Sequence, residues 1–193
     1  MKFIIRSGQI TKTSWFFIAL IPDRELRNKI NPFRFDLSDR FESVEALKSP
    51  PHITIKNPFK CSGDDREGML GWFSEMRLQQ RPFHLYLNGF RAFPNKEHPV
   101  IFINPAMSNE LIKMQRELIT GFNSILPTKV HSLDEDFKPH MTVAYRDLTP
   151  ENFSRAWQEY KDKPFYDVFD VHSIYLLEHD WKNWNIIATH KLG

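Results

Sequence analysis

A short pattern of polar and apolar residues occurs twice in this chain. It reads PHITI at residues 51–55 and PHMTV at residues 139–143. Each copy alternates between polar and apolar side chains, which predicts a β-strand on which positions i and i+2 share one face. Each strand is therefore expected to present an imidazole and a hydroxyl together on one face, with two apolar side chains behind them.

The histidines of the two copies, His52 and His140, are suited to acid–base catalysis if the strands face each other across a groove. The pKa of a free imidazole, about 6.5, lies near neutrality. One ring can accept a proton from an attacking hydroxyl or water while the other protonates a leaving oxygen, and each role contributes on the order of 10²–10⁴ in rate. The hydroxyls of Thr54 and Thr142 can hold an anion between the rings. Because a phosphodiester places its attacking and leaving oxygens on opposite sides of phosphorus, the pattern predicts phosphodiester chemistry that requires no metal.

The two copies also lie in similar surroundings. The histidines are 88 residues apart (140 − 52), a little less than half of the 193-residue chain. In each half the expected order is an apolar strand, a helix, the motif strand, a second helix and an alternating strand. This repetition predicts one α+β domain over residues 1–193, built from two β-α-β-α-β units at 15–93 and 99–190 that a pseudo-twofold axis relates. Residues 1–14 are expected to form a leader arm.

The hydrophobic patterning predicts the individual elements within these units. Proline is expected to end a helix before Pro32 and to break the first motif strand at Asn57-Pro58. Thr149-Pro150 is typical of the start of a helix. The expected strands are 15–21, 52–56, 82–93, 100–103, 140–145, 165–177 and 185–190, and the expected helices are 24–30, 67–80, 108–122 and one from 150, with an acidic loop at 127–138.

Composition narrows the class of protein. Hydrophobic residues make up 41% of the chain and aromatic residues 14%, which is enough for a globular core. A net charge of +2 is too small to indicate a general nucleic-acid coat, although a local basic groove is compatible with it. The single cysteine, Cys61, cannot form an intrachain disulfide and fits a reducing compartment. The longest apolar run, 15–21, is shorter than the roughly 20 residues that span a bilayer. A cytoplasmic monomer without a membrane segment is therefore expected.

The motif pair resembles the signature of the two-histidine (2H) phosphoesterases, the superfamily of the LigT-type 2′-5′ RNA ligases and the cyclic phosphodiesterases. The resemblance extends over roughly residues 15 to 190 and is not confined to the motifs. Beyond them, the residues that are similar to the family are FFIALIP at 16–22 with Glu25-Leu26-Arg27, Pro82-Phe83 through Gly89-Phe90 with Phe93-Pro94, and Ser173-Ile174-Tyr175-Leu176.

The resemblance implies a bilobal fold with two antiparallel sheets that face a central groove, with helices outside. It implies hydrolysis of 2′,3′-cyclic phosphates or 2′-5′-linked RNA ends without a metal or cofactor, so the implied partners are RNA ends or small cyclic nucleotides. Carried onto this chain, His52 and His140 would be the acid–base pair, and Thr54 and Thr142 would bind the phosphate. The sequence does not determine which histidine is the acid and which is the base. It also does not distinguish hydrolysis from ligation.

One departure from the family concerns the residues after the second motif. Many LigT-like members have an arginine three residues past the threonine, where this chain has Tyr145, followed by Arg146. Both are secondary candidates for substrate contact. Two further candidates follow the first motif: Lys56, which shares strand parity with His52, and Phe59, which would stack on a base if it did not pack in the core.

Three alternative interpretations remain open at this stage. The groove could belong to an RNA- or nucleotide-binding module without significant turnover. A metal-dependent hydrolase would need the acidic loop, although the spacing of its side chains matches no standard ligand pattern. Trp181 and Trp184, at an expected hairpin turn, would serve either as packing or as a lid over the groove. The residues of the acidic-loop alternative are His131, Asp134, Glu135, Asp136 and His140; the remaining histidines, expected to be structural or exposed, are His84, His98, His172, His179 and His190.

Overall fold

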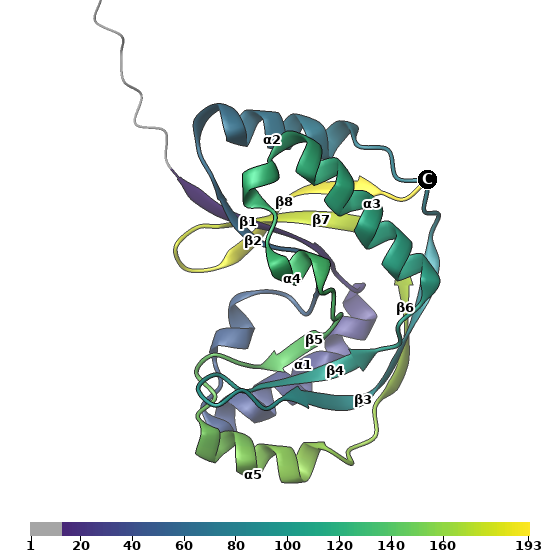
Figure 1. Cartoon of the computed structure of the whole chain (residues 1–193). Helices are drawn as coiled ribbons and strands as arrows, with labels where there is room; N and C mark the ends of the chain where they lie inside the picture. Colours follow the sequence, from purple (N-terminus) through teal and green to yellow (C-terminus); the bar gives the residue numbers. More distant parts are fainter. Residues whose placement is uncertain (1–12) are drawn as a thin grey trace, which may run out of the picture.

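The computed structural model describes residues 13–193, so residues 1–12 of the expected leader arm lie outside it, and Ser14 begins the first strand (Figure 1). The strands are β1 (Ser14–Leu20), β2 (Ile53–Cys61), β3 (Phe83–Phe93), β4 (Val100–Pro105), β5 (Met141–Ala144), β6 (Tyr166–Val171), β7 (Ser173–His179) and β8 (Trp184–Lys191). The helices are α1 (Arg24–Phe41), α2 (Gly63–Glu75), α3 (Asn109–Ile125), α4 (Ser132–Glu135) and α5 (Pro150–Tyr160), with short 3-10 helices η1 (Glu45–Lys48) and η2 (Pro127–Lys129).

The described strands form one curled antiparallel sheet in the order β6-β3-β4-β5-β2-β1-β7-β8. It consists of two four-stranded halves that meet at the motif strands β2 and β5, where Ile53 pairs with Met141. This arrangement confirms the bilobal α+β fold, and the two expected antiparallel sheets are the halves of one continuous sheet, joined by the pairing of β2 with β5. The segments 15–93 and 99–190 each contribute strands to both halves, because β3 pairs with β4 and β6 while β7 pairs with β1.

Helices cover the outer face of each half. Figure 1 shows α2 and α3 over the half that contains β1, β2, β7 and β8, and α1 and α5 over the half that contains β3 to β6. Buried aliphatic and aromatic side chains of both halves form one large core between the sheet and these helices. The opposite face of the motif strands is left uncovered. Within residues 13–193, every helix is too short or too polar to cross a membrane.

Helix α1 is longer than predicted, because it continues through Pro32 to Phe41. Its side chains at 26, 30, 34, 37 and 41 are buried in one stripe, and Asp23 caps its first turn by accepting a hydrogen bond from the N–H of Leu26 (2.8 Å). A proline inside a helix costs about 3 kcal/mol. Burial of this long stripe offsets that cost, so the tertiary packing overrides the local signal of Pro32.

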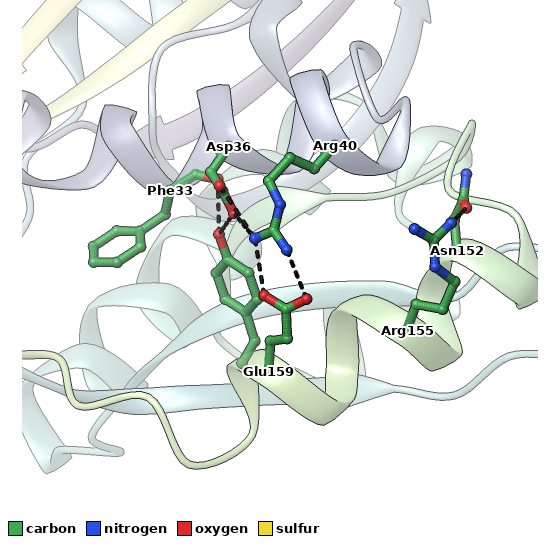
Figure 2. Close-up of polar contacts among 7 residues, drawn as sticks. Phe33, Asp36, Arg40, Asn152, Arg155 and Glu159 are labelled. Carbon is green, nitrogen blue, oxygen red and sulfur yellow. Dashed lines mark hydrogen bonds and ion pairs between the residues drawn. The ribbon is translucent and has the colours of Figure 1, made fainter.

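Helix α1 is fastened to α5 by polar contacts at the outer surface (Figure 2). Arg40 donates two hydrogen bonds to the carboxylate of Glu159, at 2.8 Å and 2.7 Å, and lies 3.3 Å from Asp36. The hydroxyl of Tyr160 donates to Asp36 (2.7 Å). Asn152 donates to the carbonyl oxygen of Phe41 (3.1 Å) at the other end of the contact. These contacts fix α1, whose C-terminal end leads into the segment before the first motif.

Strand β2 is also longer than predicted, because Asn57-Pro58 does not end it. Phe16 of β1 pairs with Phe59, and two positions later Ile18 pairs with Lys56, so a bulge in β2 takes up the extra residue beside Pro58. A bulge leaves a residue outside the ladder, which is where a proline is tolerated in a strand. A second register shift follows between Lys56 and Thr54. Because of these irregularities, the side chains after Thr54 no longer alternate regularly between the core face and the uncovered face of the sheet.

Three other boundaries differ from the expected ones. Helix α2 runs over 63–75 and not over 67–80, with Met69 and Phe73 in the core. The acidic loop contains η2 and α4, because His131 and Asp134 form a reciprocal capping box. The strand expected over 165–177 is divided into β6 and β7 at His172. The expected helices from Ser108 and Thr149 are confirmed, and the hydroxyl of each of these residues accepts an N–H from the first turn.

Candidate active site

The motif side chains of β2 and β5 meet in one cavity of about 480 Å³. His52, Thr54, His140 and Thr142 all line it. Along both strands these polar residues are partly accessible while the apolar residues between them are buried, as the alternation predicted. The pairing of β2 with β5 therefore places the two histidine–threonine pairs on the same uncovered face of the sheet.

Both histidines are held in the same way. Nδ1 of His52 lies 2.8 Å from the carbonyl oxygen of Pro50, and Nδ1 of His140 lies 2.7 Å from that of Lys138. A carbonyl oxygen only accepts, so Nδ1 carries the hydrogen in each ring and the neutral imidazole has its lone pair on Nε2. Neither Nε2 atom has a hydrogen-bond partner among residues 13–193. Each ring is thus fixed in the tautomer that leaves Nε2 free as a base.

Aromatic side chains support the two rings. The ring of His52 packs against Phe17 with centroids 4.9 Å apart, and that of His140 packs against Phe93 and Phe102 at 5.3 Å and 5.6 Å. Burial is the main cause that lowers the pKa of His52 to about 4, and the positive charge of Arg34 and the neighbouring His140 contribute to this shift. Burial also lowers the pKa of His140. Both imidazoles are therefore neutral at pH 7 before an anion binds between them.

Arg34 stabilises the chain segment that leads to His52. Its side chain is only 4% exposed. Nη2 donates to the carbonyl oxygens of Ala46 and Ser49, the latter at 2.6 Å. Burial lowers the pKa of Arg34 to about 10, which leaves it charged at neutral pH. The sequence analysis missed this residue, because it expected the helix to end before Pro32.

The same segment is tied to the loop after β5. The carboxylate of Asp147 accepts hydrogen bonds from the backbone N–H groups of Val44 (2.7 Å) and Glu45 (2.9 Å) and from the hydroxyl of Ser43 (3.0 Å). The oxygen of Ser43 in turn accepts the N–H of Tyr145 (3.2 Å). Residues just before the first motif and just after the second are therefore held together.

The two secondary candidates after the second motif both line the cavity. Strand β5 ends at Ala144, and the left-handed backbone of Arg146 (φ 64°) marks a turn just after it. Nη1 of Arg146 lies 3.9 Å from Glu45. Burial raises the pKa of the Tyr145 hydroxyl, which keeps that group protonated and able to donate.

The two candidates after the first motif lie away from the cavity. Lys56 is completely buried, 2.9 Å from Asp134 and with its ammonium over the rings of Phe59 and Phe122. Phe59 belongs to the core, where it packs against Phe122. The register shifts of β2 account for this result, because they interrupt the strand parity that placed Lys56 beside His52.

Asp134 of the acidic loop has structural contacts. The carboxylate of Asp134 accepts the N–H groups of Asn57 (2.8 Å) and His131 (2.7 Å), in addition to its contact with Lys56. Within the described range, no group of three or more His, Cys, Asp or Glu side chains is placed to hold a metal ion.

The hairpin between β7 and β8 supplies one wall of the cavity. Trp181 and Trp184 line it, as does His179, which the sequence analysis expected to be structural or exposed. Trp184 packs edge-on against Phe17 at 4.6 Å, whereas Trp181 is 70% exposed at a left-handed turn position (φ 77°). Trp184 therefore packs against the sheet and also forms part of the cavity wall, whereas the exposed Trp181 is accessible to a ligand.

Comparisons with known proteins agree with this fold. The family model of the 2′-5′ RNA ligase superfamily matches residues 22–183, and the chain belongs to that superfamily. A Bacillus licheniformis protein named "Putative phosphoesterase" is 27% identical over 179 residues, which cover 91% of this chain and 97% of the relative.

Two solved structures share the fold. Protein TT0787 of Thermus thermophilus superposes with a TM-score of 0.66 at 17% identity, over 92% of this chain and 97% of the other. Escherichia coli LigT complexed with 3′-AMP superposes with a TM-score of 0.67 at 16% identity, over 94% of this chain and 99% of the other. The chain is thus a phosphoesterase-type protein of the LigT fold.

Proposed function

We propose that this protein is a metal-independent phosphodiesterase that hydrolyses 2′,3′-cyclic phosphates or 2′-5′-linked RNA ends. The observation that carries the proposal is the pair of imidazoles with free Nε2 atoms, His52 and His140, that line one cavity from two paired strands. The threonine hydroxyls of Thr54 and Thr142 in the same cavity supply donors for the non-bridging phosphate oxygens.

Arg34 makes the two imidazoles unequal, and this inequality supports different roles for them. Its charge disfavours the protonated form of His52. A phosphate anion bound between the rings favours protonation of a neighbouring imidazole, and His140 is then the ring that takes up the proton. His52 is therefore the base and His140 the acid in hydrolysis.

In the proposed reaction, Nε2 of His52 accepts a proton from water as the oxygen of that water forms a bond to phosphorus. The bond from phosphorus to the leaving ribose oxygen breaks, and protonated His140 gives its proton to that oxygen. One water is consumed and a phosphomonoester is released. Transfer of a proton back from His52 to His140 through solvent restores the starting state.

The size and walls of the cavity support a nucleotide as the substrate. A volume of about 480 Å³ lies within the range of small-molecule sites, roughly 300–1,000 Å³. Trp181 and Trp184 offer aromatic surface on which a base can stack. The structure of LigT with 3′-AMP, a nucleoside monophosphate, is consistent with a ligand of this class.

The proposal is tested with a panel of nucleoside 2′,3′-cyclic phosphates in the presence of a chelator. Wild type should hydrolyse at least one of them, and His52→Ala and His140→Ala should each lose about 10²-fold or more of the turnover. His172→Ala, at an exposed histidine outside the cavity, is the matched control. The 2′- or 3′-phosphate product identifies the leaving oxygen. Turnover in either motif variant within a few-fold of wild type contradicts the proposal, and tight binding without any turnover would indicate a binding module.

A further inference from the structure

A second hollow, of about 560 Å³, adjoins the cavity. We call it the α1 cleft. It lies between the N-terminal turns of α1 and the segment 47–51 that leads to His52, and Ser49 and Trp184 line both hollows. A ligand that extends out of the cavity past Trp184 therefore enters the α1 cleft.

The α1 cleft is basic. Arg24 and Arg27 line it from the first turns of α1, and within residues 13–193 neither guanidinium forms an ion pair or a side-chain hydrogen bond. Lys48 also lines it but is paired with Glu45. In the part of the chain that is described, no acidic side chain belongs to its lining. The cleft thus has two free positive charges and no charge that opposes an anion.

A third arginine lies at the back of the α1 cleft. Arg34 lines it and is 4% exposed, and its Nε atom is the buried side-chain polar atom that lacks a hydrogen-bond partner among the described residues. A buried donor without an acceptor is unfavourable and uncommon in folded proteins. An anionic oxygen in the cleft is the kind of group that these guanidinium donors recognise.

We propose that the α1 cleft binds a second phosphate group of the substrate, next to the phosphate that is cleaved in the cavity. The inference rests on the proposed function, because it assumes that the cleaved phosphate lies between His52 and His140. The preferred substrate then carries at least two phosphate groups. The second group is either the next phosphodiester of an oligonucleotide or the diphosphate of an ADP-ribose derivative, since both present anionic oxygens to Arg24 and Arg27.

The test compares kcat/KM on three substrates: adenosine 2′,3′-cyclic phosphate, a dinucleotide that ends in a 2′,3′-cyclic phosphate, and ADP-ribose 1″,2″-cyclic phosphate. The quantity of interest is the ratio of kcat/KM on either larger substrate, which carries two or more phosphate groups, to kcat/KM on adenosine 2′,3′-cyclic phosphate, which carries one. In Arg24→Ala/Arg27→Ala this ratio should fall roughly fivefold to thirtyfold, as expected for two partly exposed charge contacts. The larger substrate whose ratio falls most identifies the source of the second phosphate.

Two control variants make the result specific. Arg24→Lys/Arg27→Lys keeps both charges and should retain most of the ratio. Arg81→Ala/Arg116→Ala removes the same charge from exposed positions outside both hollows and should leave the ratio at the wild-type value. An unchanged ratio in Arg24→Ala/Arg27→Ala, with wild type active, overturns this inference alone. Absence of turnover on all three substrates overturns the proposed function and this inference with it.

Discussion

Ile53 of β2 and Met141 of β5 form the register pair through which the two halves of the sheet meet. Both side chains are completely buried and belong to the core, and each lies between the histidine and the threonine of its motif. The contact at which the two halves of the sheet are paired therefore also helps to position the two imidazoles. A substitution that weakens the contact between Ile53 and Met141 is therefore also expected to displace the two imidazoles.

Truncation of this pair should lower both stability and activity. Ile53→Ala and Met141→Ala each leave a cavity in the core, so each should reduce the free energy of unfolding by about 2–5 kcal/mol. Urea denaturation measures this loss, and kcat/KM should fall even under conditions where the variants remain folded. Ile187→Ala, at an exposed position of β8, serves as the control and should change stability by less than about 0.5 kcal/mol. A core variant with full activity would show that the sheet junction does not position the histidines.

The pH dependence of catalysis should be set by the two lowered histidine pKa values. The kcat/KM value should fall as the pH decreases through the pKa of His52, about 4, because the base becomes protonated. It should also fall as the pH rises through the pKa of His140, which lies below 6.5, because the acid loses its proton. The optimum is therefore expected on the acidic side of neutrality, and a pH–rate profile with a cyclic phosphate tests this.

Arg34 provides the control for that profile. Arg34→Met removes a positive charge that lowers the pKa of His52, so the acid limb should move to higher pH. Arg34→Lys keeps the charge but loses part of the contact with Ala46 and Ser49, so turnover should fall while the acid limb stays in place. An acid limb that does not move in Arg34→Met would contradict the assignment of His52 as the base.

The lowered pKa of His52 also predicts how the stability of the protein depends on pH. Between pH 6.5 and about 4 the unfolded chain protonates His52 while the folded protein keeps it neutral. The unfolded state binds more protons in this window, so the contribution of His52 makes the protein less stable as the pH falls through it. His52→Gln should reduce the difference in urea midpoint between pH 7 and pH 4.5. An unchanged difference would show that His52 does not titrate with a lowered pKa.

The motif pair was the part of the site that could be predicted from sequence, because strand parity is a local property. His52 and Thr54 needed only the alternation of residues 51–55 to be placed on one face. Lys56 shared that parity but is buried, because the bulges of β2 arise from its register with β1, a strand roughly forty residues away in the sequence. Parity therefore predicts side-chain direction only as far as the first register shift.

Two other features depended on tertiary packing in the same way. Pro32 indicated the end of a helix, but α1 continues because its stripe packs on the sheet and on α5. Arg34 became a support for the segment before His52 only through this continuation, so its role could not follow from a helix that stopped at Ile30. The tryptophans of the β7–β8 hairpin were expected at a turn, and in the fold this hairpin lies along the cavity.

The buried pair Lys56–Asp134 should respond unequally to loss of its two partners. Asp134 accepts hydrogen bonds from Lys56, from the backbone N–H groups of Asn57 and His131 and from the side-chain amide of Asn57. Asp134→Ala leaves the ammonium of Lys56 buried without a counter-charge and should cost about 3–5 kcal/mol. Lys56→Met leaves Asp134 with its N–H donors and should cost less. Urea denaturation of both variants checks the order, and an equal or larger loss in Lys56→Met would contradict it.

Trp181 should contribute to substrate binding and little to stability. It lines the cavity but is 70% exposed, so Trp181→Ala should change the free energy of unfolding by less than about 0.5 kcal/mol. Stacking of a base on an aromatic ring contributes roughly 1–3 kcal/mol, so KM for a nucleoside cyclic phosphate should rise about tenfold. Tyr166→Ala, at a 73% exposed aromatic residue outside the cavity, is the matched control and should leave KM at the wild-type value. If both variants keep the wild-type KM, the base does not stack on Trp181, and Trp184 becomes the remaining tryptophan of the hairpin wall to test.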